Sequence, residues 1–535
     1  MFLIIVITVI YLFIIVLLGY KGMKDTKNAK DFMVGGRAIH PMVMALSYGA
    51  TFISTSAIVG FGGASGALGM GLLWLTFLNI FVGIFIAFVI FGKRTRRMGH
   101  NLDSHTFPEL LGTRFNSKFI QGFAGAVIFI FMPVYIAAVL KGGAEFITTK
   151  FNISFDVALL FLVVIVAIYV WMGGMKGVMY TDAFQALIMF AAMAFLLIFT
   201  YTKLGGVTQA HQSLTDLLNN PDVKDQTSKL AAGGFQGWTS MPKFGSPVWW
   251  NLVSTVVMGV GIGVLAQPQL VVRFMTVKSD RELNRAVASG GIFIFMMTGV
   301  AFLVGSLSNV IFFNDTGKIA AAAAGKTDSI IPEFIVRYLP EWFGAIFLVA
   351  LLAAAMSTLS SQFHALGTAA GRDLYEKTFK RKGNSITVVR VGILIGILFS
   401  AGLAFLLKFL DKDMAIIATG TALFFGLCAS TFLPAYICAL YIRKISPIAI
   451  KAGMIAGFTS SVIWIFFIHE KESAALQVCM LLTGKTSILK GTGLELVDPI
   501  FIALPMAIIV TAIVGLIVKS KLDQAILDKS FEGIR

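Results

Sequence analysis

Four hydroxyl side chains crowd a short stretch of an otherwise apolar part of the chain. Ser357, Thr358, Ser360 and Ser361 follow the apolar run 342–352, so they continue a predicted membrane helix. Those at 357, 360 and 361 share one face of that helix because they are three or four residues apart. Neutral oxygen atoms are the ligands that hard cations prefer. The stretch 353–373 therefore indicates a site for a hard cation such as sodium.

Each hydroxyl taken alone has a simpler explanation. A Ser or Thr in a membrane helix can donate to a carbonyl one turn earlier, and small side chains let neighbouring helices pack closely. Four neutral hydroxyls also cannot balance the charge of a cation. A cation site here therefore needs further oxygen ligands, and a negative charge, from other parts of the chain.

The second apolar span, 42–63, can supply backbone oxygens. Its middle is rich in Gly, Ser and Thr, and Gly costs about 1 kcal/mol relative to Ala inside a helix. A break in this helix would expose carbonyl groups at membrane depth, where secondary transporters bind coupling ions. The alternative is a continuous helix whose small residues pack against its neighbours. That alternative leaves the hydroxyls of 353–373 without partners.

Asp182 can supply the negative charge. It lies several residues inside the span 178–203. A carboxylate at membrane depth costs about 2.5–3.5 kcal/mol, which makes such a residue a functional candidate. The alternative is an interfacial carboxylate paired with Lys176.

The seventh span, 247–275, is also predicted to be broken. Pro268 interrupts the helical hydrogen bonds, and three glycines shortly before it loosen the helix further. Gln267 and Gln269 can bond either a polar solute or the freed backbone. The broken second and seventh spans lie five spans apart, as two inverted halves of a transporter require.

The composition is that of a polytopic membrane protein. Of the 535 residues, 57% are hydrophobic and 13% are charged, and the mean hydropathy is +0.86. Ordinary soluble domains have about a quarter of their residues charged. The three cysteines and six histidines are scattered without metal-binding spacing, so we expect neither a disulfide framework nor an enzyme.

Thirteen apolar runs are long enough to cross a lipid bilayer. They are 2–20, 42–63, 69–92, 119–146, 155–173, 178–203, 247–275, 286–314, 342–370, 386–410, 413–441, 449–469 and 499–519. Residues 1–20 lack a basic start and a cleavage site, so we expect a retained first span with the N-terminus outside.

The charge pattern agrees with this topology. The segments predicted to lie inside hold 29 of the 43 Lys and Arg residues, as cytoplasmic loops do. The net charge of +16 is thereby explained without nucleic acid. We expect a multi-pass protein of the cell (plasma) membrane with its C-terminus inside.

Four sequence motifs resemble those of the sodium/solute symporter family, which includes sodium/proline, pantothenate, monocarboxylate, sialic acid and glucose transporters. They are DFMVGGRAIHP at 31–41, GGMKG at 173–177 with TDAFQ at 181–185, QPQ at 267–269 with RFM at 273–275, and MSTLSS at 356–361 with RDLY at 372–375. In order and spacing these motifs cover nearly all of the chain up to the last span.

The resemblance implies an amino-acid transporter-like five-plus-five inverted repeat that forms one transmembrane domain, 1–535. An extra helix, 1–20, precedes the first repeat, 42–203, and the second repeat, 247–441, is followed by two C-terminal helices, 449–519. The implied function is sodium-coupled import of a small organic solute by alternating access.

The resemblance also implies two sodium sites. The common site of the family corresponds to the backbone carbonyls of Ala50, Ile53 and Ala354 and the side-chain hydroxyls of Ser357 and Thr358. A second site, similar to that of the sialic acid transporters, corresponds to Asp182, Ser357, Ser360 and Ser361. Sodium is the only coupling ion that these residues predict.

The implied solute pocket is small, partly aromatic and uncharged. Phe52 stands where the sodium/proline type has an acidic residue, and Ser56 and Ala57 stand where the sugar transporters carry sugar ligands. These departures disfavour proline and sugars and favour a carboxylate or amino-acid-like solute. The residues implied for the pocket are Phe52, Thr55, Ser56, Tyr135, Gln267 and Phe424.

Two other functions remain as alternatives. A cation-permeable channel would need a repeated selectivity loop, and the chain shows none. A transporter-like sensor without coupled uptake would need an output domain, for which the tail 519–535 is too short.

Overall fold

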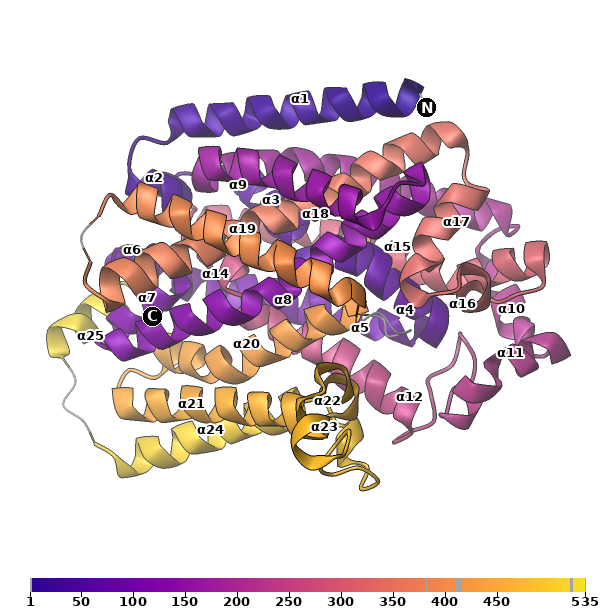
Figure 1. Cartoon of the computed structure of the whole chain (residues 1–535). Coiled ribbons are helices and arrows are strands. Elements are labelled where there is room, and N and C mark those ends of the chain that lie inside the picture. Colours follow the sequence, from indigo (N-terminus) through magenta and orange to yellow (C-terminus); the bar gives the residue numbers. More distant parts are fainter. Residues whose placement is uncertain (1, 382, 410–415, 520–522, 535) are drawn as a thin grey trace.

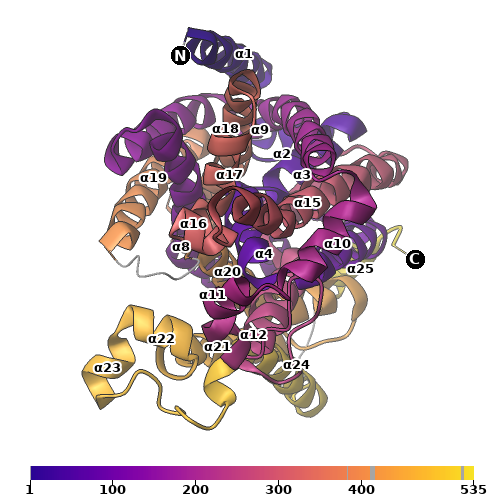
Figure 2. The same ribbon diagram turned by 90° about the vertical axis from the view of Figure 1, so that its right-hand side faces the viewer.

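The computed structural model describes residues 2–381, 383–409, 416–519 and 523–534 (Figure 1). Within these ranges the chain is helical and contains no strand. Most of the long helices run side by side in one direction, and short helices and loops lie at the two ends of the bundle (Figures 1 and 2). The predicted all-α polytopic fold class is confirmed.

Eleven helices within the described residues are long and apolar enough to cross a membrane. They are Phe2–Asp25 (α1), Met70–Asn101 (with α5, Leu73–Ile80, and α6, Lys93–Asn101), Lys118–Thr148 (in α8, Lys118–Phe151), Phe155–Lys203 (α9), Pro247–Ala266 (with α12, Pro247–Trp249, and α13, Val260–Gly263), Asp280–Thr316 (α15), Glu341–Thr378 (with α18, Glu341–Thr368), Ser385–Leu406 (in α19, Ser385–Phe409), Ile417–Tyr441 (in α20, Ile416–Tyr441), Pro447–Ile468 (with α21, Pro447–Ile463) and Ile500–Ile517 (α24).

Shorter helices connect these spans. They are α2 (Ala29–Val34), α7 (Phe107–Arg114), α10 (Val207–Leu217), α11 (Pro221–Ala232), α14 (Pro268–Phe274), α16 (Ala320–Ala324), α17 (Ile330–Tyr338), α22 (Glu470–Leu476), α23 (Val478–Thr483) and α25 (Gln524–Phe531). The loop 204–246, which is predicted to lie outside, contains α10 and α11.

The second span is broken, as predicted. Its first part, α3 (Pro41–Phe52), ends because Ile53 is extended, with φ −89° and ψ 97°. The chain becomes helical again at Ser56, continues into α4 (Phe61–Leu68), and is bent by 51° at the break. The carbonyl groups at the end of α3 therefore lack the partners that a continuing helix would provide.

The seventh span is broken as well. Gln267 is extended, with φ −74° and ψ 116°, and α14 begins at Pro268. Proline disfavours a helical conformation in the residue before it and has no N–H to donate, so the break falls where the sequence predicts it.

The predicted count of thirteen spans depends on how α9 is counted. This element has 49 residues, about 74 Å of helix, which is more than twice the thickness of the hydrocarbon core. It is interrupted at Gly174, where φ is 55° and ψ is −159°. A Cβ atom on Gly174 would lie 2.7 Å from the Phe32 ring. The structure gives eleven spans, or twelve with the bent pair Pro41–Leu68, and reaches thirteen only if the two arms of α9 are counted separately.

The buried fraction of each span shows which helices lie at the centre of the bundle and which lie at its margin. The apolar window of α18 is 94% buried, whereas those of α1 and α24 are 17% and 22% buried. α1 lies along α9 at one margin of the bundle, and α21 and α24 lie together at the opposite margin (Figures 1 and 2). The hydroxyl-bearing helix α18 is therefore the core of the molecule, and the helices outside the predicted repeats are peripheral.

The segments predicted to lie inside meet at one end of the bundle. Polar contacts join them in pairs, which is expected if all of them end on the same side of the membrane. The pairs are Arg37 with Ser104, Arg96 with Asp280, Lys176 with Asp31, Arg372 with Glu109, Arg114 with Ile442 and Arg443 with Asp528. The structure supports their common side, and the assignment of that side to the cytoplasm stays a prediction.

Candidate functional site

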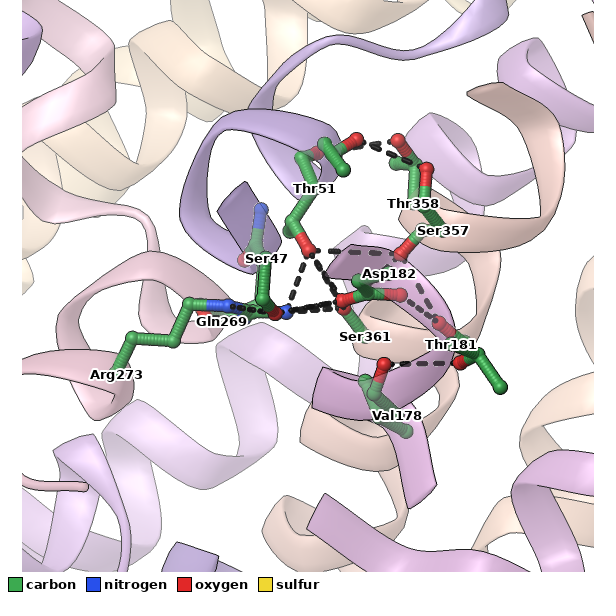
Figure 3. Close-up of polar contacts among 12 residues, drawn as sticks. Ser47, Thr51, Val178, Thr181, Asp182, Gln269, Arg273, Ser357, Thr358 and Ser361 are labelled. Carbon is green, nitrogen blue, oxygen red and sulfur yellow. Dashed lines mark hydrogen bonds and ion pairs between the residues drawn. The ribbon is translucent and has the colours of Figure 1, made fainter. Parts of the chain in front are cut away.

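Polar side chains from α3, α9, α14 and α18 converge at the centre of the bundle (Figure 3). They sit there because both broken helices end beside the hydroxyl-rich turn of α18. All of them are at most 3% exposed, so each must find its partners inside the protein. They are Ser47, Thr51, Asp182, Arg273, Ser357, Thr358, Ser360 and Ser361.

The hydroxyls of α18 cap the broken end of α3. Ser357 Oγ donates to the Ala50 carbonyl over 2.9 Å and lies 3.3 Å from the Ala354 carbonyl. Thr358 Oγ1 donates to the Thr51 carbonyl over 3.1 Å. These contacts bring Ala50, Ala354, Ser357 and Thr358 of the predicted common sodium site together, beside Ile53 at the break itself.

The spacing of these oxygens suits a small cation. Calcium, which is close to sodium in size, binds oxygen ligands at 2.3–2.6 Å, so neighbouring ligands of an octahedral site are about 3.4 Å apart. The observed separations of 2.9 and 3.3 Å need to widen by only a few tenths of an ångström. A cation could thus take the place of these hydrogen bonds, with each hydroxyl keeping its proton and turning its oxygen toward the ion, without moving either helix far.

A second cluster surrounds Asp182. Its carboxylate accepts hydrogen bonds from Ser360 Oγ over 3.2 Å and from Ser361 Oγ over 3.3 Å. Ser47 Oγ, from α3, donates to the same carboxylate over 2.8 Å. The side chain of Ser357 points to Ala50 instead, so of the four residues predicted for the second sodium site the structure brings three together directly.

Arg273 also reaches into this cluster. Its Nη2 lies 2.9 Å from Asp182 Oδ2 and 2.5 Å from the hydroxyl oxygens of Thr51 and Ser361. The guanidinium thus provides the positive charge that the carboxylate needs in a buried site. In this conformation a tethered cation lies where the sequence predicts a second sodium ion (Figure 3).

The interfacial alternative for Asp182 is wrong. Asp182 is fully buried, and Lys176 pairs instead with Asp31 at 2.8 Å. Sequence reasoning did not assign roles to Ser47, Thr51 and Arg273. The charge of Arg273 within an apolar context, five residues after Pro268, was the signal that could have identified it.

A small cavity lies beside the break in α3. It has a volume of about 20 Å³ and is lined by aromatic rings, aliphatic side chains and a few neutral polar groups, with no charged residue among the described lining residues. That space holds about one water molecule. Asn79 lines the cavity, and its Oδ1 has no hydrogen-bond partner among the described residues.

Two of the six residues predicted for solute binding line this cavity, Phe52 and Tyr135. Phe424 does not line the cavity, but its ring stacks on the Tyr135 ring, with 6.0 Å between the ring centroids. Thr55 Oγ1 donates to the Val139 carbonyl, and Gln267 Nε2 donates to the Gly263 carbonyl. Both side chains therefore donate to backbone carbonyls. Ser56 is buried nearby without lining the cavity.

A wider cavity of about 290 Å³ lies next to the small one, at the end of the bundle opposite the cationic segments. Helices α4 and α20 contribute to the lining of both cavities. Phe61 and Thr421 line the small cavity, whereas Ala64 and Thr419 line the wide one. The two cavities therefore lie close to each other along these two helices.

Comparisons with known proteins agree with this fold. The family described as "Sodium:solute symporter family" matches residues 32–457. The osmoregulated proline transporter OpuE of Bacillus subtilis is 29% identical over 467 residues, covering 85% of this chain and 87% of that protein. The sodium/proline symporter of Salmonella typhimurium is 26% identical over 463 residues, covering 85% and 86%. A solved structure of a Na⁺-coupled sialic acid symporter, in a substrate-bound outward-open state, superposes with a TM-score of 0.74 at 19% identity and covers 98% of this chain and 99% of that one.

Proposed function

Because the chain belongs to the sodium:solute symporter family, we propose that it imports a small organic carboxylate together with sodium by alternating access. Sodium-coupled symport of a small organic solute is the activity of the family. The residues, the stoichiometry and the class of solute are our proposal, and each rests on the geometry of the central site.

The contact between Ser357 Oγ and the Ala50 carbonyl carries the proposal. A sodium ion that binds here shares its ligands between α3 and α18, so it holds the broken helix in one position. Solute binds beside the same break, against Phe52. Each ligand therefore favours the arrangement of α3 that the other needs, and the coupling free energy acts equally in both directions.

Asp182 and Arg273 suggest how the protein returns to its starting state after it has released sodium and solute. A second sodium ion at Asp182, Ser360 and Ser361 would compete with the Arg273 guanidinium for the same carboxylate. We propose that the loaded carrier holds sodium there and that Arg273 replaces it once sodium has left. The carboxylate then keeps a cationic partner throughout the cycle, which avoids the cost of a buried unpaired charge, about 3–5 kcal/mol.

The neutral pocket supports a carboxylate as the solute. The proline transporters and the sialic acid symporter named above carry solutes that both contain a carboxylate, and no charged residue lines the pocket in the described part of the chain. A sodium ion bound at the break would supply a positive charge beside Phe52 that could balance a carboxylate. Asn79 and the hydroxyls near Phe52 supply hydrogen bonds, and the aromatic rings limit the size of the solute.

Uptake into proteoliposomes tests this function. A panel of monocarboxylates, amino acids, pantothenate and sialic acid is offered with an inward sodium gradient and with potassium replacing sodium. We expect saturable uptake of one class that collapses without sodium. Sodium flux without saturable solute uptake would instead indicate a channel, and solute binding without uptake would indicate a sensor.

The proposed setting is the cell membrane, with the cationic end of the bundle in the cytoplasm. The wide cavity near Thr419 then opens outward, toward the incoming solute. Labelling of single cysteines introduced at Lys24 and at Lys485 by a membrane-impermeant reagent tests the orientation. We expect labelling from outside at position 485 alone.

A further inference from the structure

A second cavity, unrelated to the central site, lies at the cationic end of the bundle. It has a volume of about 520 Å³ and lies between the π-helical segment before α6, the start of α15, the end of α20 and the C-terminal tail. Its lining has a basic part, which we call the basic wall and which comprises Lys93, Arg94 and Arg97, and an apolar part, the apolar wall, which comprises Ile90 and Tyr441. None of its described lining residues belongs to the central site or lines the two cavities beside that site.

The positive charges of the cavity exceed its negative charge. Asp280 is the single carboxylate in the described lining, and it already pairs with both Arg97 and Arg96. Arg94 donates to the Leu440 carbonyl over 2.9 Å and stacks on the Tyr441 ring at 4.3 Å, contacts that fix the position of its guanidinium in the wall. Lys93 makes no hydrogen bond or ion pair with the part of the chain that the structure describes. The cavity therefore favours an anion.

The apolar wall continues along a face that a membrane would cover. Ile90 is 41% exposed, and Phe81 and Phe85 of the same helix are 47% and 49% exposed. The rings of Phe77, Phe81 and Phe85 stack in a row, with 5.9 Å between the first two ring centroids and 6.0 Å between the last two. This segment, Phe81–Gly92, is a π-helix, so Phe85 and Ile90 lie about one turn apart on a similar side. A continuous apolar track thus leads from the basic wall into the hydrocarbon region.

We propose that this cavity binds an anionic phospholipid, with the phosphate of the headgroup at Lys93 and Arg94 and the acyl chains along Ile90, Phe85 and Phe81. The occupant follows from the two walls together, because a soluble anion would leave the apolar wall unused, and the cationic choline of a zwitterionic lipid would offset the attraction of its phosphate to Lys93 and Arg94. Basic pockets between membrane helices on the cytoplasmic side bind such headgroups in other proteins. The bound lipid would also contact the tail, since Gly533 and Ile534 complete the cavity.

Lipid titrations of the purified full-length protein in detergent test the site. The probes are short-chain phosphatidylglycerol, short-chain phosphatidylcholine and inorganic phosphate, and the readouts are the midpoint of thermal unfolding and the lipid retained in native mass spectrometry. We expect stabilisation and retention with phosphatidylglycerol alone, and a weakening of both as salt rises from about 0.1 M to about 1 M.

Variants locate the site within the chain. Lys93→Gln should bind phosphatidylglycerol about fivefold more weakly, because one basic residue near an anionic headgroup contributes about 1 kcal/mol. Lys93→Arg should restore binding, and Lys24→Gln, which removes an exposed cation at the same end of the bundle but outside the cavity, should leave it unchanged.

Four outcomes would overturn the proposal. Equal stabilisation by phosphatidylcholine would mean that the net negative charge of the lipid is not recognised. Equal stabilisation by inorganic phosphate would mean that the site takes a soluble anion. Undiminished binding to Lys93→Gln would place the lipid elsewhere. If that variant does not fold, binding of phosphatidylglycerol to the unmodified protein that is insensitive to salt would exclude the basic wall as its site.

Discussion

The Arg273 guanidinium lies 2.9 Å from the Asp182 carboxylate, and neither side chain is more than 1% exposed. The two residues come from different predicted repeats, because Asp182 belongs to α9 and Arg273 to α14. Removing either partner leaves a buried charge uncompensated, at a cost of about 3–5 kcal/mol, whereas replacing both is much less costly. This relationship makes the roles of the two residues separable by experiment.

Arg273→Met should slow the return of the empty carrier. Without the guanidinium, Asp182 has no cationic partner once sodium has left. We expect net uptake to fall about tenfold or more, while exchange of labelled for unlabelled solute, which needs no empty return step, falls much less. Parallel assays of net uptake and exchange in proteoliposomes measure the ratio. Equal losses in both would contradict the role assigned to Arg273.

Asp182→Asn should lower the number of sodium ions per cycle. The amide keeps the shape of the side chain but removes the charge that a second cation needs. We expect the Hill coefficient for sodium to fall toward one and the protein to remain folded. An unchanged sodium dependence would remove Asp182 from the set of ligands. The double variant Asp182→Asn with Arg273→Met should be more thermally stable than either single variant, since both buried charges are gone.

Ser357→Ala combined with Thr358→Ala should weaken the common sodium site. Two oxygen ligands are lost, so we expect the sodium concentration for half-maximal uptake to rise about tenfold or more. Thr200→Ala is the matched control, because the Thr200 hydroxyl is also fully buried in a membrane helix but bonds only back to the Leu196 carbonyl. Full activity of the double variant at low sodium would refute the site.

Asn79→Leu should weaken solute binding. The Asn79 amide lines the small cavity, and its Oδ1 has no partner among the described residues, so it is placed to bind a polar group of the solute. Loss of such a hydrogen bond costs about 1–3 kcal/mol, or about a five- to hundredfold rise in the solute concentration for half-maximal uptake. Sodium titrations at saturating solute serve as the control and should change little. An unaltered solute dependence would place the solute elsewhere.

His469 should make stability depend on pH. Burial alone would lower the pKa of His469, but the adjacent Glu472 carboxylate raises it above the ordinary value of about 6.5. A raised folded-state pKa means that the stabilisation is present below about pH 6.5 and is lost as the pH rises through the folded-state value. As the pH is raised from about 5 to about 9, the midpoint temperature of thermal unfolding should fall for the unmodified protein and should fall less for His469→Gln. Identical slopes would contradict the pairing.

Much of the fold and part of the site follow from local sequence patterns. Apolar length indicates the spans, Pro268 and the glycines of 42–63 indicate the breaks, and the spacing of Ser357, Ser360 and Ser361 puts three hydroxyls on one face. These features depend on helix geometry and on the membrane as solvent, so they need no knowledge of which helices touch. The assignment of Ala50 and Ile53 came from family resemblance.

The tertiary structure alone decided which charges meet. By sequence Lys176 is the nearest cation to Asp182, yet Lys176 pairs with Asp31, and Arg273 comes from 91 residues away. Likewise Asn79, and not Thr55 or Gln267, lines the small cavity with Phe52. Pairings of this kind depend on how the two broken helices cross α18, because a buried charge is satisfied by whichever partner the packing brings within hydrogen-bond distance. The chain by itself therefore determined the oxygens that we propose as sodium ligands, and the packing determined the cation that lies among them.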